Sequence, residues 1–388
     1  MEVKEIKALR ENIWNKYLEN LRNDEERKKE VEEKAMHFGE VTMKYGMKIM
    51  GEPDKNGYPL YIALHGGGGS DTPDINNQQW EHMGIYYADS VKQGIYVNPR
   101  GVRDTWDCHA NPESYPLYDR LIENMIAFYN ADPNRVYICG YSAGGDGVYM
   151  IAPRMADRFA ACHMSAGHHN GTSVYNLYNT PIRLQVGQRD EFYDRHRVTV
   201  EYMMLLDKYQ EEFKGGYVHS GFVNYETGHN FKDWSEELQP VVADPYKWYE
   251  TGEAEKKMAD INAIHFLKDF TRNPNPEKIV WDLGNRGNER KVNSFYWLQA
   301  PMSVNEGMVV ASLNKENNQI AIEKNTTGKE IEILVNEDMV DMNRPLTIVD
   351  SEGNKKTVVV EVSDDVITNT TLERGDKNYQ YIAKFNAR

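Results

Sequence analysis

The chain contains 388 residues, of which 40% are hydrophobic and 27% are charged, with 29 Gly and 15 Pro. This composition is typical of a folded globular protein and excludes collagen, a coiled coil and wholesale disorder. The formal net charge of −15 argues against nucleic acid or an anionic membrane as a partner. No stretch approaches the roughly 18 consecutive apolar residues that a membrane span needs. The three separated cysteines predict neither a zinc motif nor a disulfide framework.

The first residues do not have the pattern of an export signal. Met1–Arg10 mixes charged and apolar residues and has no uninterrupted hydrophobic segment, so we expect a cytoplasmic protein. Secretion stays open as the alternative if a leader preceded these residues. Residues 1–38 are predicted to form an N-terminal helical segment, because apolar residues recur at three- and four-residue steps from Val3 to Leu21.

Between residues 39 and 272, short apolar runs alternate with helical patterns. This alternation requires crossover connections, which predicts an α/β domain with a mostly parallel sheet and helices on both faces. The predicted strands are Leu60–Leu64, Gly94–Val97, Arg135–Cys139, Ala160–Ser165, Ile182–Val186 and Val218–Tyr225. The predicted helices are Leu117–Tyr129, Ala143–Met155, Asp194–Phe213 and Ala254–Phe270.

A change of composition after Asn273 predicts a second domain. The run Asn-Pro-Asn-Pro-Glu at 273–277 is a candidate linker, because each Pro disfavours helix in the residue before it. Residues 278–388 contain short alternating or β-branched runs separated by turn residues, which predicts a smaller all-β, sandwich-like C-terminal domain. We expect this domain to be a contact in a homo-oligomer or a stabilising appendage; a carbohydrate-binding module is the alternative.

The strongest motif is the run Gly-Tyr-Ser-Ala-Gly at 140–144, which follows the predicted strand Arg135–Cys139. Gly-x-Ser-x-Gly between a strand and a helix is typical of a nucleophile elbow, in which the glycines permit a tight turn that exposes the Ser142 hydroxyl. The helix N-terminus behind it offers a positive dipole to an anion, and Asp146 favours that end of the helix. The alternative is a glycine-rich turn with an ordinary serine.

A second glycine run supports this interpretation. His-Gly-Gly-Gly-Gly at 65–69 follows the predicted strand Leu60–Leu64. Glycines at this place permit backbone conformations that turn N–H groups toward a developing oxyanion. The run lacks the Lys-Ser/Thr of a nucleotide P-loop and does not fit a dinucleotide fingerprint. Acyl transfer is therefore the more economical interpretation.

A serine nucleophile needs a base and an orienting carboxylate, and in α/β-hydrolases the acid precedes the histidine in the chain. Asp190 lies in the loop after a predicted strand, and Glu191 and Asp194 are its neighbouring alternatives. His229 follows the last predicted strand of the alternating region, where a loop can bring its imidazole to Ser142. The other histidines that follow Asp190 fall inside predicted helices or strands.

Together these motifs resemble the α/β-hydrolase superfamily, and within it the polyhydroxybutyrate depolymerase-like and feruloyl esterase-like esterases. The resemblance implies that Ser142 is the nucleophile, that His229 is the general base and then the acid, and that Asp190 orients His229. It also implies that backbone N–H groups of Ala143 and Gly67 form the oxyanion hole. Neither a metal nor another cofactor is needed for this chemistry.

The resemblance implies a serine hydrolase that cleaves a carboxylic ester through a covalent acyl-enzyme. The leading substrates are acyl esters of a carbohydrate or of a hydroxyacid. The expected partner is therefore a small-molecule ester or a carbohydrate ester. A peptidase or amidase of the prolyl oligopeptidase-like type would use the same motifs, although the typical propeller of those peptidases cannot fit before the α/β region. A non-catalytic binding protein on a hydrolase fold is the third alternative, and the intact Ser, Asp, His order argues against it.

Several residues near these motifs are candidates for substrate binding. Trp106 follows a predicted strand, in a loop at the edge of the sheet where ligands bind in such folds. His169 follows another strand at the same edge; its neighbour His168 invites a metal site, but no carboxylate stands at a useful local spacing, so no metal is predicted. Aromatic side chains near the motifs are compatible with a sugar or an aromatic acyl group, and these are Tyr141, Tyr193, Phe231 and Trp234.

Overall fold

The structure is a computed structural model that describes residues 1–69, 73–231 and 238–388. The chain forms two compact units, one of Glu33–Arg272 and the other of Met1–Glu32 together with Asn273–Arg388. The N-terminal helix thus belongs to the same unit as the C-terminal residues, an association for which the sequence gives no pattern.

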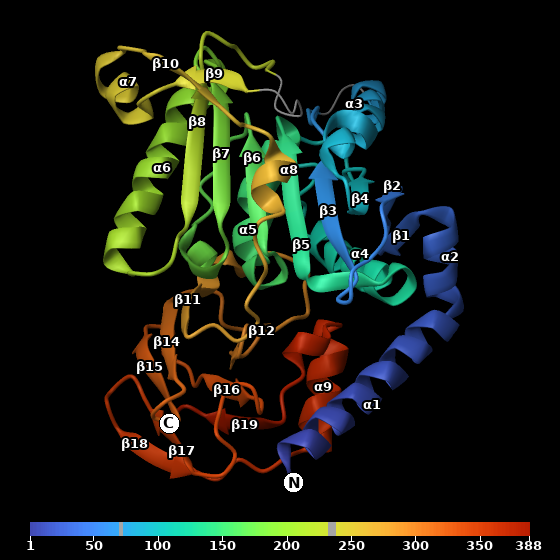
Figure 1. The fold of residues 1–388 in the computed structure, drawn as a ribbon, viewed down its shortest axis with the longest axis vertical. Coiled ribbons are helices and arrows are strands. Elements are labelled where there is room, and N and C mark those ends of the chain that lie inside the picture. Colours follow the sequence, from blue (N-terminus) through green and yellow to red (C-terminus); the bar gives the residue numbers. More distant parts are fainter. Residues whose placement is uncertain (70–72, 232–237) are drawn as a thin grey trace. The chain divides into compact units, whose positions relative to one another are not determined.

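A ten-stranded sheet lies at the centre of the unit Glu33–Arg272 (Figure 1). The strands from β4 to β8 in the order of the sheet run parallel, and the strands beyond them at both edges pair antiparallel. This confirms the predicted α/β class with a mostly parallel sheet. In order across the sheet, the strands are β1 (Ala35–Phe38), β2 (Val41–Met50), β4 (Gly94–Pro99), β3 (Tyr58–Leu64), β5 (Ala131–Tyr141), β6 (Ala161–Ser165), β7 (Ile182–Gly187), β8 (His219–Asn224), β9 (Gln239–Val242) and β10 (Lys256–Ala259).

Helices cover both faces of this sheet, as the buried residues of β3 illustrate. Successive side chains of a strand point to opposite faces. Tyr61 and Ala63 pack in one apolar cluster with residues of α3 and α8, whereas Leu64 lies against Gly147 of α5. A strand buried on both faces needs a continuous apolar run, which is the pattern that the sequence has here. The helices of this unit are α3 (Pro73–Tyr86), α4 (Ser114–Tyr129), α5 (Ala143–Arg154), α6 (Arg195–Glu212), α7 (Pro245–Thr251) and α8 (Ala263–Leu267).

The prediction of helix up to residue 38 is wrong for its last residues. Helices α1 (Val3–Asn23) and α2 (Glu25–Glu33) end before Ala35–Phe38, which is strand β1. This strand forms an antiparallel hairpin with β2, and the turn contains Gly39 in the left-handed region at φ 57°. A four-residue strand is too short to show a period of two against the helical pattern that precedes it.

The predicted helix Ala254–Phe270 is also wrong in its first half. Residues Lys256–Ala259 form β10, which pairs antiparallel with β9, and the helix α8 covers only Ala263–Leu267. The side chain of Asn262 accepts hydrogen bonds from the backbone N–H groups of Ile264 and His265 and so begins the helix there. An N-cap residue inside a helical pattern divides it, because the capping residue itself is not helical.

The second unit contains two further sheets in its C-terminal part, one with five strands and one with four. It also contains the helix α9 (Asp364–Arg374), so this region is not all-β as predicted. Ser363 caps the helix and Gly375 ends it in the left-handed region, but the β-branched residues between them favour a strand in the sequence. The five-stranded sheet has the order β11 (Lys278–Asp282), β14 (Met308–Asn314), β15 (Gln319–Asn325), β17 (Leu346–Val349) and β18 (Lys355–Val358). The four-stranded sheet has the order β12 (Ser294–Phe295), β13 (Leu298–Gln299), β16 (Glu332–Val335) and β19 (Ala383–Asn386).

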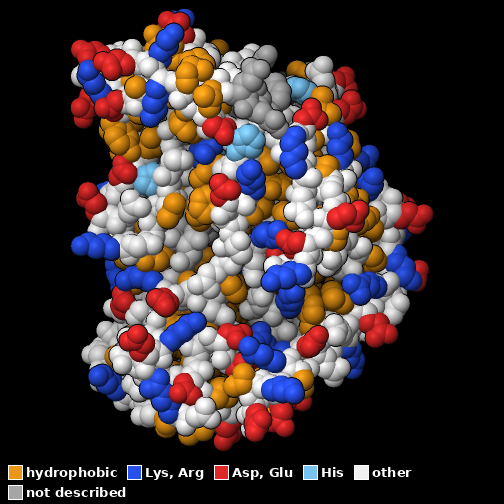
Figure 2. Space-filling model, viewed as in Figure 1, with side chains coloured by type: hydrophobic (Ala, Val, Ile, Leu, Met, Phe, Trp, Pro, Cys, Tyr) orange, Lys and Arg blue, Asp and Glu red, His pale blue; other side chains and the backbone are white. Residues whose placement is uncertain are grey.

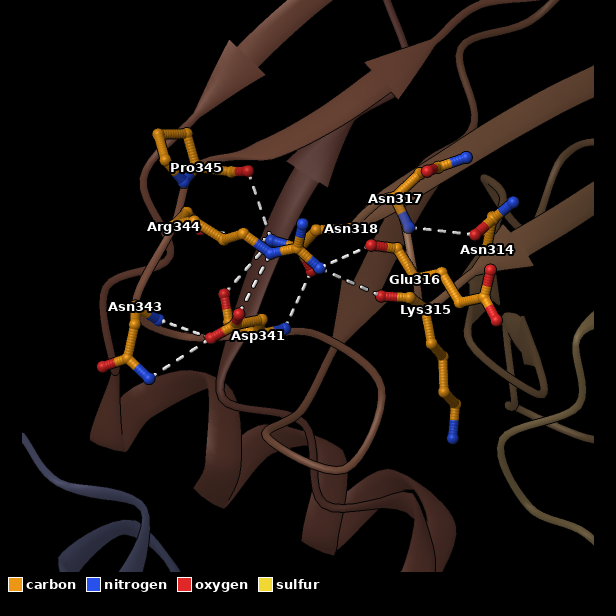
Figure 3. Close-up of polar contacts among 9 residues, drawn as sticks. All are labelled: Asn314, Lys315, Glu316, Asn317, Asn318, Asp341, Asn343, Arg344 and Pro345. Carbon is orange, nitrogen blue, oxygen red and sulfur yellow. Dashed lines mark hydrogen bonds and ion pairs between the residues drawn. The ribbon is translucent and has the colours of Figure 1, made fainter.

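A buried asparagine fixes the turns of the five-stranded sheet (Figure 3). Asn318, at the turn between β14 and β15, donates from its side-chain amide to the carbonyl groups of Asp341, Arg344 and Pro345 at 3.1–3.2 Å. Its side-chain oxygen accepts the backbone N–H of Asp341 at 2.8 Å. The Asn318 side chain thus forms hydrogen bonds with backbone groups of residues 341–345. We therefore assign this cluster a role in stabilising the fold of its unit.

Charges of both signs are interspersed on the face of the molecule that Figure 2 shows. An extended basic surface, of the kind that binds nucleic acid, is not seen on that face. Among the residues that the structure describes, no helix combines the length and the apolar character required to cross a membrane.

Candidate active site

Ser142 lies at a sharp turn between β5 and α5, as the Gly-x-Ser-x-Gly motif predicts. Its backbone has φ 59° and ψ −119°, a conformation that a non-glycine residue adopts only where the surrounding structure enforces it. The flanking glycines are required by close packing. A Cβ at Gly140 would lie 2.2 Å from the carbonyl oxygen of Gly144, and one at Gly144 would lie 2.0 Å from that of Leu64.

The structure brings Ser142, His229 and Asp190 into one chain of hydrogen bonds. His229 Nε2 lies 2.9 Å from Ser142 Oγ, and His229 Nδ1 lies 2.8 Å from Asp190 Oδ2. The Asp190 side chain is fully buried, whereas 30% of the His229 side chain is exposed. In this geometry Nδ1–H donates to the carboxylate, which leaves the Nε2 lone pair directed at the serine hydroxyl. Glu191 and Asp194, the alternative acids, make no such contact among the described residues.

The loops that carry Asp190 and His229 approach each other through two glycines. A Cβ at Gly187 would lie 1.9 Å from the carbonyl oxygen of Gly228, so no side chain fits there. The backbone N–H of Arg189 donates to the carbonyl of Thr227 at 2.8 Å and ties the two loops together. This contact explains how two residues that follow different strands come within hydrogen-bond distance.

The glycine run after β3 lies beside the serine turn. Gly67 and Gly68 have φ of 100° and 90°, which favours glycine at both positions. Asn76 of α3 accepts the N–H of Gly68 at 2.8 Å and donates to its carbonyl at 3.1 Å. Gly67 and Ala143, the two predicted oxyanion donors, both line one cavity next to the serine. The asparagine that holds this loop was not predicted, because the helix that carries it was not.

His65 and His109 hold the start of the same loop through hydrogen bonds. His65 Nδ1–H donates to the Gly66 carbonyl at 2.6 Å, and its Nε2 accepts the N–H of Gly101 at 3.0 Å. His109 Nε2–H donates to the His65 carbonyl at 2.9 Å. Burial holds the pKa of His65 well below its usual value and lowers that of His109 to about 4, so both rings are neutral.

His65, His109 and Cys108 also form a group of potential metal ligands within 4.8 Å of one another. Both ring nitrogens of His65 are already engaged in hydrogen bonds, so neither is available to a metal. Burial raises the pKa of the Cys108 thiol to about 12. These residues therefore fit a loop-anchoring cluster and do not fit a metal site.

A cavity of about 520 Å³ opens beside the serine turn. Asp146 and Arg195 contribute two charged side chains to the cavity wall. Neither residue was predicted to belong to the site. Arg195 Nη1 also lies 3.7 Å from Asp190 Oδ1, so this cation faces both the cavity and the buried carboxylate. The described residues that line the cavity are Gly67, Gly69, Trp106, Ala143, Asp146, His168, Asn170, Tyr193 and Arg195.

The three residues expected to bind substrate lie in different settings. Trp106 lines the cavity and is 54% exposed. Tyr141 donates from its hydroxyl to the His229 carbonyl at 2.7 Å, with its ring centroid 5.3 Å from that of His229, so it contacts the histidine loop. His169 stacks on Tyr202 with ring centroids 4.3 Å apart. Trp234 lies outside the described residues.

Replacing Asn76 by alanine is expected to lower kcat for ester hydrolysis by about 10- to 100-fold with little change in KM. Both backbone groups of Gly68 would lose their partner, and a misplaced donor in the predicted oxyanion hole would cost on the order of 1.4 to 3 kcal/mol of transition-state stabilisation. Steady-state kinetics and the unfolding temperature of the variant check this prediction. Gln78→Ala is the matched control, because this side chain lies on the same helix and is exposed. Equal losses in both variants would contradict a specific role for Asn76.

The strand order and the serine at the turn after β5 define an α/β-hydrolase fold. No family model matches the chain. A stretch of 105 residues, 26% of this chain, is 32% identical to part of the bifunctional acetylxylan esterase/xylanase XynS20E of Neocallimastix patriciarum and covers 15% of that protein. The chain therefore spans only a small part of this relative.

Solved structures to which the chain is similar include a thermostable esterase, with 21% identity, a TM-score of 0.40, and 61% of this chain and 63% of that chain covered. Another is LpqC, a poly(3-hydroxybutyrate) depolymerase from Bordetella parapertussis, with 16% identity, a TM-score of 0.39, and 55% and 85% covered. A third is a ferulic acid esterase, with 15% identity, a TM-score of 0.37, and 56% and 94% covered.

Proposed function

We propose that the protein is a serine hydrolase that cleaves carboxylic esters through a covalent acyl-enzyme. One observation carries this proposal: the hydrogen-bonded chain from Ser142 Oγ through His229 to the buried Asp190, with distances of 2.9 and 2.8 Å. A serine hydroxyl becomes nucleophilic only when a base can take its proton, and this chain provides the base and the group that orients it.

In the proposed reaction, Ser142 Oγ attacks the ester carbonyl carbon while its proton passes to His229 Nε2. The tetrahedral intermediate collapses as the carbon–oxygen bond to the alcohol breaks, and His229 gives its proton to the departing oxygen. Water then attacks the acyl-serine while its proton passes to His229; the bond between the acyl carbon and Ser142 Oγ breaks, His229 returns the proton to Oγ, and the carboxylic acid leaves. Asp190 stabilises the imidazolium in both steps without taking its proton.

The backbone N–H groups of Ala143 and Gly67 are proposed to stabilise the negative oxygen of the intermediate. Support comes from their common position along the cavity wall and from the positive φ that the glycine loop adopts. The N-terminus of α5 directly behind Ser142 adds a positive partial charge to the same region.

The proposed substrates are acyl esters of a carbohydrate or of a hydroxyacid. The local similarity to a protein named as an acetylxylan esterase/xylanase is compatible with the first of these. A peptidase or amidase with the same residues is the competing proposal, since amide and ester hydrolysis use the same nucleophile and base.

Paired substrates test the choice between ester and amide. The purified full-length chain is incubated with a 4-nitrophenyl ester and the 4-nitroanilide of the same acyl group. We expect ester hydrolysis to exceed amide hydrolysis in kcat/KM by more than the ratio of their uncatalysed rates. If the ester-to-anilide ratio of kcat/KM is smaller than the ratio of the uncatalysed rates, the peptidase is favoured. Hydrolysis of neither substrate by the folded protein would favour a non-catalytic role.

A further inference from the structure

The carboxylate of Asp146 occupies the cavity wall close to the proposed nucleophile. Asp146 lies in the first turn of α5, and its backbone N–H donates to the carbonyl of Ser142 at 2.9 Å. Its side chain accepts a hydrogen bond from the backbone N–H of His168 at 2.7 Å and also interacts with the Asn170 side chain. A carboxylate offers about four acceptor positions, so this group can accept further donors from a ligand in the cavity.

Arg195 contributes a cation to the same cavity. Its side chain is only 11% exposed, and its Nη1 donates to the Phe192 carbonyl at 3.4 Å. Its Nε is buried and has no hydrogen-bond partner among the described residues. The part of the Arg195 side chain that lines the cavity can donate to a ligand there.

Two exposed aromatic side chains also line the cavity. Trp106 is 54% exposed and Tyr193 is 76% exposed. Tyr193 and Asp194 both have φ in the left-handed region, at 55° and 57°, which is an unfavourable conformation for two consecutive non-glycine residues. Strain of this kind persists where the surrounding structure enforces it and is concentrated at ligand-binding sites. Here it orients the Tyr193 ring near Arg195, whose guanidinium lies 5.0 Å from the ring centroid.

We propose that this cavity recognises hydroxyl groups: Asp146 accepts from, and Arg195 donates to, an uncharged hydroxylated part of the ester. A hydroxyl is both donor and acceptor, so it can serve either residue. A carboxylate ligand would be attracted by Arg195 but repelled by Asp146, and an ammonium ligand the reverse, so neither complements both residues. A purely aliphatic group would remove water from both charges and return no hydrogen bond. The inference deepens and rests on the proposed ester hydrolysis.

The hydroxyl could belong to the acyl group or to the alcohol of the ester, and two pairs of substrates distinguish these sources. In the acyl pair, 4-nitrophenyl 3-hydroxybutyrate is compared with 4-nitrophenyl butyrate. In the alcohol pair, a monoacetylated methyl pyranoside is compared with cyclohexyl acetate. Within each pair the selectivity ratio is kcat/KM for the hydroxylated ester divided by kcat/KM for the plain ester.

We expect the wild-type protein to prefer the hydroxylated ester in one of the pairs, and Asp146→Asn to lower that selectivity ratio at least tenfold. Asparagine keeps the size of the side chain and an oxygen for the His168 N–H, but it loses the charge that strengthens a hydrogen bond from a hydroxyl. Asp89→Asn is the matched control, because Asp89 is exposed and the change in net charge is the same. Its selectivity ratio should equal that of the wild type.

Arg195→Gln provides a second variant if Asp146→Asn does not fold. Arg195 also faces Asp190, so its loss affects turnover of both esters, but that common effect cancels in the selectivity ratio. We expect this ratio to fall here as well. Equal selectivity in wild type and folded variants, or no wild-type preference in either pair, would overturn the inference. Hydrolysis of none of the four esters would instead overturn the proposed function.

The pH dependence of selectivity gives an independent measurement. Burial raises the pKa of Asp146 to about 6, and Arg195, His229, the His168 N–H and Asn170 oppose this rise. The carboxylate is therefore charged above about pH 6 and protonated below it. We expect the wild-type selectivity ratio to fall between pH 7 and pH 5 and the Asp146→Asn ratio to stay constant. Because both esters use the same proposed nucleophile and base, a common change in turnover cancels in the ratio, and a constant wild-type ratio would count against Asp146.

Discussion

Ser142→Ala is expected to reduce kcat/KM for ester hydrolysis by on the order of 10⁴- to 10⁶-fold. Alanine cannot form the acyl-enzyme, and any residual rate would come from the cavity and the oxyanion donors alone. The variant should also lose covalent labelling by a fluorophosphonate probe at pH 8. Progress curves with a 4-nitrophenyl ester and labelling followed by mass spectrometry give the two measurements.

Ser303→Ala is a suitable control, because this serine is exposed and belongs to the other unit. It should hydrolyse the ester and react with the probe like the wild type. The substitution also relieves no strain, since the alanine backbone must adopt the same φ of 59°. Labelling that persists in Ser142→Ala, on a different residue, would show that the nucleophile has been misassigned.

Asp190→Asn is expected to lower kcat by on the order of 10³- to 10⁴-fold. The amide can present its NH₂ group to His229 Nδ1, which would move the imidazole proton to Nε2 and remove the base from Ser142. Asp190 is fully buried and 2.8 Å from the ring, so water cannot replace it. Kinetics of the purified variant, together with its unfolding temperature, test this effect.

Glu191→Gln is the matched control for this experiment, since Glu191 is the adjacent carboxylate and is exposed. It should retain at least half of the wild-type kcat. If Glu191→Gln lost more activity than Asp190→Asn, Glu191 would have to replace Asp190 as the carboxylate that orients His229.

The residues of the hydrogen-bonded chain could be predicted because their local patterns are strong. Glycines flank Ser142, Asp190 follows a buried strand, and His229 follows the last parallel strand. Side chains after parallel strands meet at one edge of the sheet, so the order of motifs along the chain carries three-dimensional information. The contact between the two loops, in which Gly187 meets the Gly228 carbonyl, could not be predicted, since it depends on the relative position of two strands.

The remainder of the candidate site has no local pattern. Asp146 fits the N-terminal turn of a helix, and Arg195 begins the next helix, so each has an ordinary role when taken alone. Only folding brings them to the same cavity. Asn76 lies on a helix with weak apolar periodicity, and Tyr141 resembles any aromatic residue until its hydroxyl is located at the His229 carbonyl.

In the fold, too, elements with a strong local pattern could be predicted and elements without one could not. Buried central strands such as β3 have long apolar runs that identify them. The edge strands β1 and β10 have four residues each, and their pairing depends on neighbours that are distant or differently patterned. In α9, the β-branched residues outweigh the capping signals at its ends, so local propensity points to the wrong element.

Because α1 shares a unit with residues 273–388, its partners are synthesised long after it leaves the ribosome. Arg10 Nη1, for example, donates to Glu337 at 2.6 Å, and Ile6 and Trp14 are buried in the finished fold. At ordinary translation rates the nascent helix waits roughly 16 to 65 s for Glu337, while the intervening α/β unit can already fold. Removing residues 273–388 would therefore leave α1 without the rest of its unit.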